Sequence, residues 1–226
     1  MAMTWFNMII QGLKETVYMT LASTFLSYLF GLPLGIILTI TDQGHIMPNK
    51  IINNILGTII NLARSIPFLI LMVAVLPFTR FLLGTTIGST ATIVPLVIGA
   101  IPFVARMVES SLKEIDTGVI EAAQSMGASP YQIVFKVMIP ESYPSLVNGS
   151  VITTTTILGY SAMAGVIGGG GLGDLAIRYG YHRYQTGIML ITILILIILV
   201  QIIQILGTFW SKKINHKKNL WKSGGI

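Results

Sequence analysis

Five long runs of apolar residues alternate with shorter polar segments along the chain. They lie at about residues 16–40, 55–79, 87–109, 142–166 and 185–210. A helix rises about 1.5 Å per residue, so about 20 apolar residues cross a hydrocarbon core about 30 Å thick. The pattern therefore predicts an all-α integral membrane protein with five transmembrane helices.

The fourth run is the least apolar of the five. It contains Asn148, Ser150 and four consecutive threonines at 153–156. Polar side chains are costly in lipid, so this helix is expected to face protein or water. No repeat, low-complexity segment or linker separates the runs. We therefore expect one transmembrane domain, residues 12–210, and a basic cytoplasmic tail, residues 211–226.

The composition adds to this prediction by excluding other classes of protein and of site. Of the 226 residues, 53% are hydrophobic and 10% are charged, whereas soluble proteins carry about 25% charged residues. So few charges cannot cover a surface that faces water, which excludes a soluble globular protein. The absence of cysteine excludes disulfides and thiolate metal sites. The first apolar run lacks a basic flank and a cleavage site, so no signal peptide is expected.

The net charge of +6 is concentrated at the C-terminus. Five lysines lie in the last fifteen residues: Lys212, Lys213, Lys217, Lys218 and Lys222. A basic tail after an apolar helix is expected to contact anionic lipid headgroups rather than nucleic acid. The positive-inside rule then predicts a cytoplasmic C-terminus and an outside N-terminus. The other basic residues expected on the cytoplasmic side are Lys50, Arg64, Arg106, Lys113 and Lys136.

The polar loop at about 110–141 carries signals for two short helices. Asp116 or Thr117 can cap the first helix, and Glu121 lies near its positive end. Val119, Ile120, Ala123 and Met126 recur at helical spacing and form an apolar stripe. Gly127 is expected to end this helix in a left-handed conformation.

The second short helix is predicted to start at Ser129. Ser129 is placed as the N-cap, Pro130 at the first helical position and Gln132 as the partner in a capping box. Pro140 is expected to stop this helix and open the next span. The result is a capped, angled helix pair. On pattern alone, the alternative is an ordinary interfacial helix lying on the membrane.

The loop also carries a motif. Glu121-Ala122-Ala123 is followed after three residues by Gly127, and nine residues later by Val137-Met138-Ile139-Pro140. This order resembles the signature of permease subunits of bacterial binding-protein-dependent ABC importers, although their usual ending is Ile-x-Leu-Pro. The segments 64–68, 77–80, 102–109, 159–165 and 179–181 are similar to methionine-uptake permeases within that family. The resemblance covers about residues 10–210.

The resemblance implies the type I ABC importer permease fold in a bacterial plasma membrane, as a multi-pass, non-catalytic subunit. It implies a homodimer with the translocation path at its interface, two ATP-binding subunits that hold the cytoplasmic loops, and an extracytoplasmic substrate-binding lipoprotein. ATP is then bound by the partner subunits, and no cofactor is expected in this chain. The docking-loop residues that it implies are Glu121, Ala122, Ala123, Met126, Gly127, Ser129, Pro130, Tyr131 and Pro140. The implied substrate is methionine, as the D- or L-isomer or both; the alternative is another amino acid or a small amphiphile.

The translocation path is placed by the resemblance near Tyr160, Ser161, Met163 and Pro67. One flexible, apolar Met163 from each copy would seal a narrow gate. The alternative is a packing methionine, since the chain contains eleven. Arg64, Arg106 and Glu109 are expected to reach the cytoplasmic headgroups from span ends, with an ionic latch at the inner gate as the alternative.

The sequence gives little support for nucleotide binding, metal binding, catalysis or ion-coupled transport by this chain. The run Gly168–Gly173 fits G-x-G-x-x-G, but Asp174 and Leu175 follow where a phosphate-binding loop needs Lys and Ser or Thr. A tight outward-side turn is expected instead, and the resemblance implies that 165–185 contacts the binding protein. The histidines lie in different loops, so neither a metal site nor a catalytic group is expected. A secondary transporter would need carboxylates deep in the spans, where none is expected.

Overall fold

A computed structural model describes the backbone of residues 2–223 and the side chains of residues 5–211. The regular elements in this part of the chain are all helical. They are α1 (Ala2–Ile40), α2 (Lys50–Ser65), α3 (Phe68–Leu83), α4 (Ser89–Lys113), α5 (Thr117–Ser125), α6 (Pro130–Gln132), the π-helical turn η1 (Ile133–Met138), α7 (Ile139–Ala164), the 3-10 turn η2 (Gly165–Ile167), α8 (Gly171–Leu175), the π-helical turn η3 (Ala176–Tyr181) and α9 (Thr186–Ser223).

Within these described residues, four continuous helices are long and apolar enough to cross a membrane. They are Trp5–Ile40, Ser89–Lys113, Pro130–Ile167 and Thr186–Ser211. These helices contain or closely match four of the five predicted runs, and the first and third of them begin well before the predicted runs. The backbone of α9 continues past residue 210, and the tail lysines have side chains outside the described residues.

The second predicted run, 55–79, is wrong as a single helix. It is divided between α2 and α3, which meet at 105°, so the chain has five spans only if this bent pair counts as one. The break lies at Ile66, which is extended with φ −79° and ψ 123°, directly before Pro67. A residue that precedes proline avoids helical angles, and proline has no N–H to continue the ladder. Pro67 therefore ends one helix and begins another.

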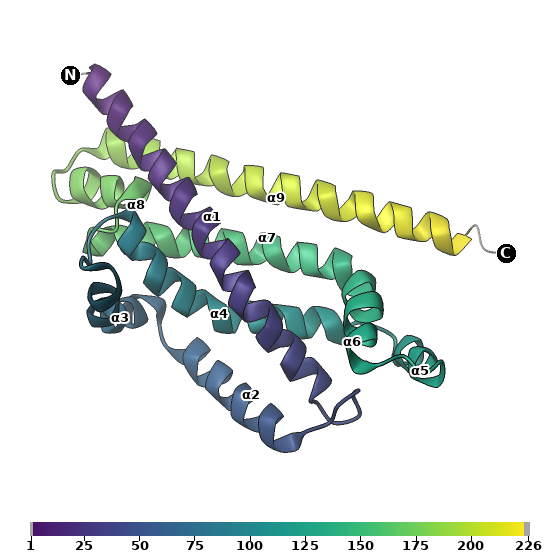
Figure 1. Ribbon diagram of the computed structural model, residues 1–226. Coiled ribbons are helices and arrows are strands. Elements are labelled where there is room, and N and C mark those ends of the chain that lie inside the picture. Colours follow the sequence, from purple (N-terminus) through teal and green to yellow (C-terminus); the bar gives the residue numbers. More distant parts are fainter. Residues whose placement is uncertain (1, 224–226) are drawn as a thin grey trace.

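The long helices run between two ends of the molecule (Figure 1). α1 crosses α4, and it also packs against α7 and α8. α7 returns beside α4, and α9 lies along α7. The turn at 41–49, α5, α6 and the C-terminal end of α9 share one end, whereas the N-terminus and α8 lie at the other.

The crossing of α1 and α4 depends on two glycines. A Cβ added at Gly31 would lie 2.7 Å from Val104, and one at Gly35 would lie 2.6 Å from the Ala105 carbonyl oxygen. The G-x-x-x-G spacing on α1 therefore permits a close helix contact, as such spacing does in membranes. Val104 and Ala105 are fully buried as a result.

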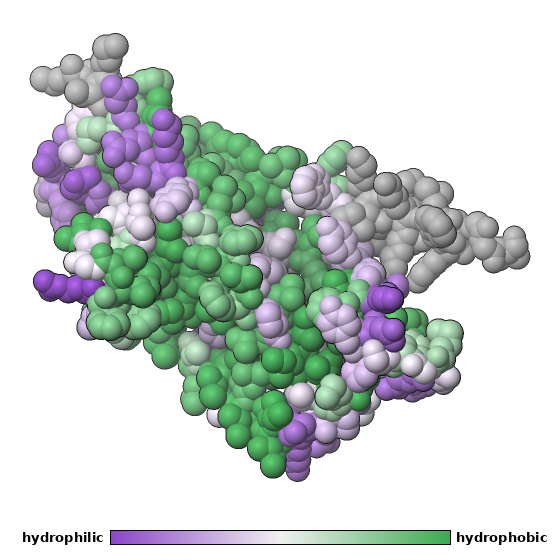
Figure 2. All heavy atoms as spheres, viewed as in Figure 1, coloured by the Kyte–Doolittle hydropathy of each residue, from purple (hydrophilic) through white to green (hydrophobic). Residues whose placement is uncertain are grey.

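The surface has an apolar middle. Hydrophobic residues cover the central part of the view in Figure 2, and hydrophilic residues gather toward its ends. α4 is the most enclosed of the four long helices, with 61% of its apolar window buried, whereas only 6% of the α9 window is buried. α4 is thus the central helix, and α9 presents its side chains to lipid or to another chain.

The helix contact at Gly35 makes a stability prediction. Gly35→Ala forces its methyl group against the Ala105 carbonyl, so we expect a loss of about 1–3 kcal/mol of stability. The measurement is the melting temperature of the detergent-solubilised protein. Gly159→Ala is the matched control, because no atom lies within 4 Å of a Cβ at that helical position. Equal melting temperatures for the two variants would contradict the close contact.

Candidate functional site

The loop between α4 and α7 begins with α5. The Asp116 carboxylate accepts a hydrogen bond of 2.7 Å from the Gly118 N–H, which identifies Asp116 rather than Thr117 as the N-cap. At the other end, Gly127 adopts φ +78°, and the Ala128 N–H donates to the Ala123 carbonyl at 3.1 Å. The predicted left-handed glycine end is confirmed.

The second helix begins with the predicted capping box. The Ser129 N–H donates to Gln132 Oε1 at 2.9 Å, and the Gln132 N–H donates to Ser129 Oγ at 3.4 Å. Pro130 occupies the first helical turn, where its missing N–H costs nothing. The predicted starts of both short helices are therefore confirmed.

The expectation that Pro140 stops the second helix is wrong. The helix continues from α6 through η1 into α7, and the Ile139 N–H donates to the Val134 carbonyl, five residues back. A proline in an α-helix clashes with the carbonyl four residues earlier and leaves it without a donor. The wider π-helical turn lies directly before Pro140, so the helix passes the proline without stopping.

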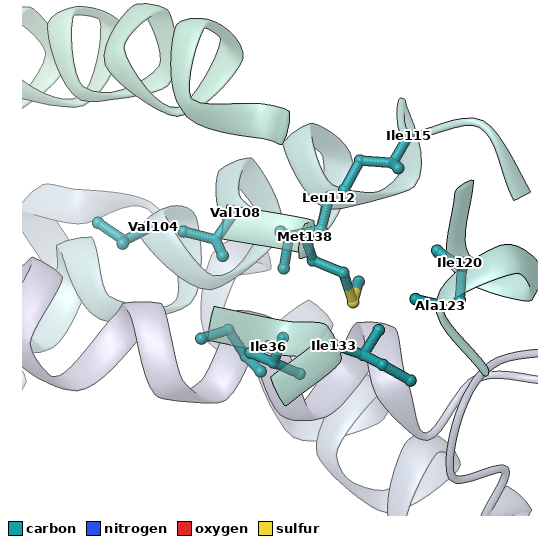
Figure 3. Close-up of a cluster of buried hydrophobic side chains, with 10 residues drawn as sticks. Ile36, Val104, Val108, Leu112, Ile115, Ile120, Ala123, Ile133 and Met138 are labelled. Carbon is teal, nitrogen blue, oxygen red and sulfur yellow. The ribbon is translucent and has the colours of Figure 1, made fainter. Parts of the chain in front are cut away.

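The inner side of the loop is fixed to the long helices. Ile120 and Ala123 of α5 are buried in one apolar cluster with Ile133 and Met138 of η1. The other members include Ile36 of α1, three residues of α4 (Val104, Val108 and Leu112) and Ile115 just after it. Figure 3 shows these side chains converging from the loop, α1 and α4. The loop therefore moves together with the ends of the spanning helices.

The outer side of the loop is exposed and partly apolar. Met126 is 81% exposed, Tyr131 is 69% exposed and Val119 is 40% exposed. The single predicted stripe is thus divided: Ile120 and Ala123 face the core, and Val119 and Met126 face outward. Glu121, Ala122, Gly127, Ser129, Pro130 and Pro140 are exposed as well. Exposed apolar groups on an ordered loop are typical of an interaction surface.

An ion-pair network joins the same end of α4 to its neighbours. Glu109, which is buried, lies 2.6 Å from Arg106 Nη1 and 2.9 Å from Lys113 Nζ. Arg106 also donates to Asn61 Oδ1 on α2, and Lys113 lies 2.6 Å from Asp42. The hydrogen bond from Lys113 lowers the pKa of the Asp42 carboxyl, so this pair stays ionised at neutral pH. The expected headgroup contact is wrong for Arg106 and Glu109, since both are engaged within the protein.

Two of the four predicted path residues, Tyr160 and Pro67, lie near the break between α2 and α3. The ring of Tyr160 stacks on Phe68 with centroids 4.1 Å apart, and Pro67 directly precedes Phe68. Met163 lies one turn beyond Tyr160 and is 50% exposed. Ser161 is buried, and its hydroxyl donates to the Leu158 carbonyl at 2.7 Å. Ser161 therefore faces the protein interior and does not share this surface.

Sequence reasoning placed Arg64 at a cytoplasmic span end, which is wrong. Its guanidinium lies 6.0 Å from the ring centroid of Phe103. Phe103 is fourteen residues from the start of α4 and ten residues from its end. Phe68 and Phe103 were not predicted as site residues. The available signal was the charged residue within an apolar run, three positions before Pro67.

The glycine-rich segment forms the expected tight turn at the opposite end from the loop (Figure 1). Gly168, Gly170 and Gly171 have φ between +74° and +81°. The Gly171 N–H donates to Glu15 Oε2 and the Leu172 N–H donates to Thr16 Oγ1, each at 2.8 Å. The turn is thereby attached to α1. Among the described side chains, no group of three His, Cys, Asp or Glu residues could hold a metal ion.

A protein-family profile described as the inner membrane component of binding-protein-dependent transport systems matches residues 31–216. The chain belongs to this family. Its members form the membrane part of transporters, which agrees with the multi-span helical fold. The glycine-rich turn therefore lies in a transporter subunit and not in a nucleotide-binding fold.

The relatives are close and cover most of the chain. The probable D-methionine transport system permease protein MetI of Vibrio cholerae is 49% identical over 94% of this chain and 96% of its own length. MetI of Escherichia coli K12 is 50% identical over 72% of this chain and 74% of its own. An inward-facing structure of the MetNI methionine ABC transporter matches with TM-score 0.91 and 47% identity, over 92% of this chain and 96% of that one. An amino acid ABC transporter at 21% identity and TM-score 0.77 shares the fold.

The end of α5 makes a prediction that separates backbone strain from steric contact. A Cβ at Gly127 would meet nothing within 4 Å, so only its φ of +78° restricts substitution. Gly127→Val should destabilise the turn by at least about 1–2 kcal/mol and change the angle between the two short helices. We expect faster limited proteolysis of residues 116–132 with unchanged membrane insertion. Gly127→Asn, which tolerates this conformation, should remain near wild type; equal proteolysis of both variants would refute the assignment.

Proposed function

We propose that this protein is the membrane-spanning permease subunit of an ATP-driven importer of methionine, as the D- or L-isomer or both. The observation that carries the proposal is its near full-length relationship to proteins named as D-methionine permeases. The match to a structure of the MetNI methionine transporter, at TM-score 0.91 and 47% identity, agrees with it. ATP would be bound by partner subunits and not by this chain.

The proposed partners are a second copy of this chain, two ATP-binding subunits and an extracytoplasmic substrate-binding lipoprotein. The capped loop with exposed Met126 and Tyr131 suits the ATP-binding subunits, because its inner side is fixed to the long helices. The segment 165–185, at the opposite end, suits the binding protein. Its exposed aromatic residues include Tyr181 and Tyr184.

The proposed location is the bacterial plasma membrane, with the N-terminus outside and the C-terminus in the cytoplasm. The two termini lie at opposite ends of the bundle, which supports opposite sides (Figure 1). Arg64, which lies beside the middle of α4, no longer counts among the basic residues of the cytoplasmic side. The other basic residues still favour the end that carries the docking loop and the tail.

The geometry supports a mechanical role for the loop. Closure of the ATP-binding subunits would move α5, and the shared cluster would pass the displacement to α1 and α4. η1 and α7 form one continuous helix that leads from the loop to Tyr160 and Met163. A push at the loop would therefore reach the path surface through packed helices with discrete arrangements.

Reconstitution tests the function and the orientation together. With ATP enclosed in vesicles, and the binding protein and labelled methionine outside, the complex should accumulate methionine in the lumen. A cysteine replacing Gln43, in the turn at the docking-loop end, should resist an impermeant maleimide added outside, whereas one replacing Thr85 should react. The chain has no cysteine of its own to interfere. Uptake of other amino acids but not methionine would refute the substrate, and the reverse labelling would refute the orientation.

The gate is tested at Met163. Replacing its half-exposed side chain by alanine removes a flexible apolar plug, so ATP hydrolysis without binding protein should rise several-fold. Met163→Leu keeps the volume and apolar character and should stay close to wild type. Unchanged hydrolysis and unchanged methionine leak in Met163→Ala would identify Met163 as a packing residue.

A further inference from the structure

A pocket lies where α2 gives way to α3. Its volume is about 240 Å³, and its lining includes Arg64, Ile66, Phe68, Gly99, Phe103 and Tyr160. At about 30 Å³ per water molecule, this is room for about eight waters or for one small solute. The lining combines one cation with three aromatic rings.

Arg64 has no anionic partner in this pocket. Its guanidinium lies over the Phe103 ring, 6.0 Å from the centroid, but makes no hydrogen bond or ion pair with the residues that the structure describes. The buried carboxylate nearest along α4, Glu109, is already held by Arg106 and Lys113. The chain has only eight acidic residues. No other carboxylate is shown to pair with Arg64 among the described residues.

The position of Arg64 beside a membrane-spanning helix makes its unpaired charge energetically costly. Phe103 lies about 21 Å along α4 from Ser89 and about 15 Å from Lys113, at about 1.5 Å per residue. Arg64 is therefore close to the middle of the spanning region. Charged residues in that position pair with one another, face water or mark the pathway of a substrate. The guanidinium fork also matches a carboxylate in a two-point contact.

The other walls are suited to an apolar side chain. Phe68 and Tyr160 stack with their rings nearly parallel, at an interplanar angle of 5°, and Ile66 is exposed beside them. Gly99 permits α4 to approach α3 closely at this wall, because a Cβ there would lie 3.1 Å from Leu71 and 3.2 Å from Phe68. Tyr160 is one helical turn from Met163, so the pocket lies beside the proposed gate.

We propose that this pocket is a substrate-binding site within the translocation path. Arg64 binds the α-carboxylate of a zwitterionic amino acid, and the rings of Phe68, Phe103 and Tyr160 contact its apolar side chain. The inference rests on the proposed import function and names the residues that hold the substrate during its passage. It also accounts for Arg64, which lies beside the middle of α4 and has no partner in the ion-pair network.

The direct test is protection of a single cysteine in the pocket. Ile66→Cys, in the complex with the ATP-binding subunits but without the binding protein, is treated with a small methanethiosulfonate reagent. Methionine should slow the labelling, whereas methioninamide, which lacks the carboxylate, should not. Protection should disappear when Arg64→Gln is added. A cysteine at Gln43 is the control and should react equally with and without methionine.

Uptake gives the second readout. Loss of a charge-assisted contact should lower methionine uptake at subsaturating substrate by roughly 10-fold to 100-fold in Arg64→Gln. Arg64→Lys should be intermediate, because it keeps the charge without the fork. Arg80→Gln, with the same change of charge at the end of α3, should transport normally. The assembly of the complex and its basal ATP hydrolysis should be retained in all three variants.

The outcomes separate the two proposals. Normal uptake in Arg64→Gln, or protection by methioninamide as strong as by methionine, overturns the pocket and leaves the import function standing. No methionine uptake by the wild-type complex overturns the proposed substrate instead. In that case, carboxylate-dependent protection by another amino acid still supports the pocket. Absence of protection by any of the common amino acids overturns it.

Discussion

The close approach of α1 to α4 is the contact on which the rest of the structure depends. Gly31 and Gly35 bring the two backbones together over Val104 and Val108. Water contributes no driving force inside a bilayer, so such packing must come from close contact alone. The same valines belong to the cluster that holds the docking loop. The central helix pair and the loop are therefore parts of one packed unit.

That unit separates the protein into rigid and open parts. α4, α1 and the loop share buried side chains, whereas α2 and α3 expose most of theirs and meet at a sharp bend. The open parts surround the break at Pro67, where Arg64, Phe68 and Tyr160 gather. A surface that must accept a passing solute cannot be filled by its own side chains. Rigid packing at the loop and open space at the break are the two properties that the proposed transport path requires.

Local signals in the sequence were reliable where one residue decides one hydrogen bond or one backbone angle. The caps at Asp116 and Ser129 and the turn at Gly127 were predicted, because each depends on its nearest neighbours. Four of the five apolar runs were located, since hydropathy depends on lipid exposure. The family resemblance supplied the function, whereas its placement of the path near Tyr160, Met163 and Pro67 stays a prediction.

Prolines and charges were misjudged because their effect depends on surroundings that the sequence does not show. Pro67 breaks a helix, whereas at Pro140 the helix continues because a π-helical turn directly precedes the proline. The residues before each proline do not predict this difference. Arg64 was placed near a membrane surface because its charge was taken to mark a span end. In the structure, its guanidinium lies beside Phe103, near the middle of α4. Ser161 was misplaced because neighbouring positions on a helix point in different directions.

The π-helical turn also has a consequence for how the chain tolerates changes in length. A π turn holds one residue more than the α-helical turn that it replaces, so it absorbs that residue without rotating the rest of the helix. Elsewhere in α7, an inserted or deleted residue would rotate the remaining helix by about 100°. That rotation would exchange the face of Tyr160 and Met163 for the buried face of Ser161. At Ile133–Met138, the helix can instead gain or lose the extra residue of the π-helical turn, and the residues after it keep their orientation around the helix axis. The loop and the path surface can thus diverge in sequence length while their mutual orientation is preserved.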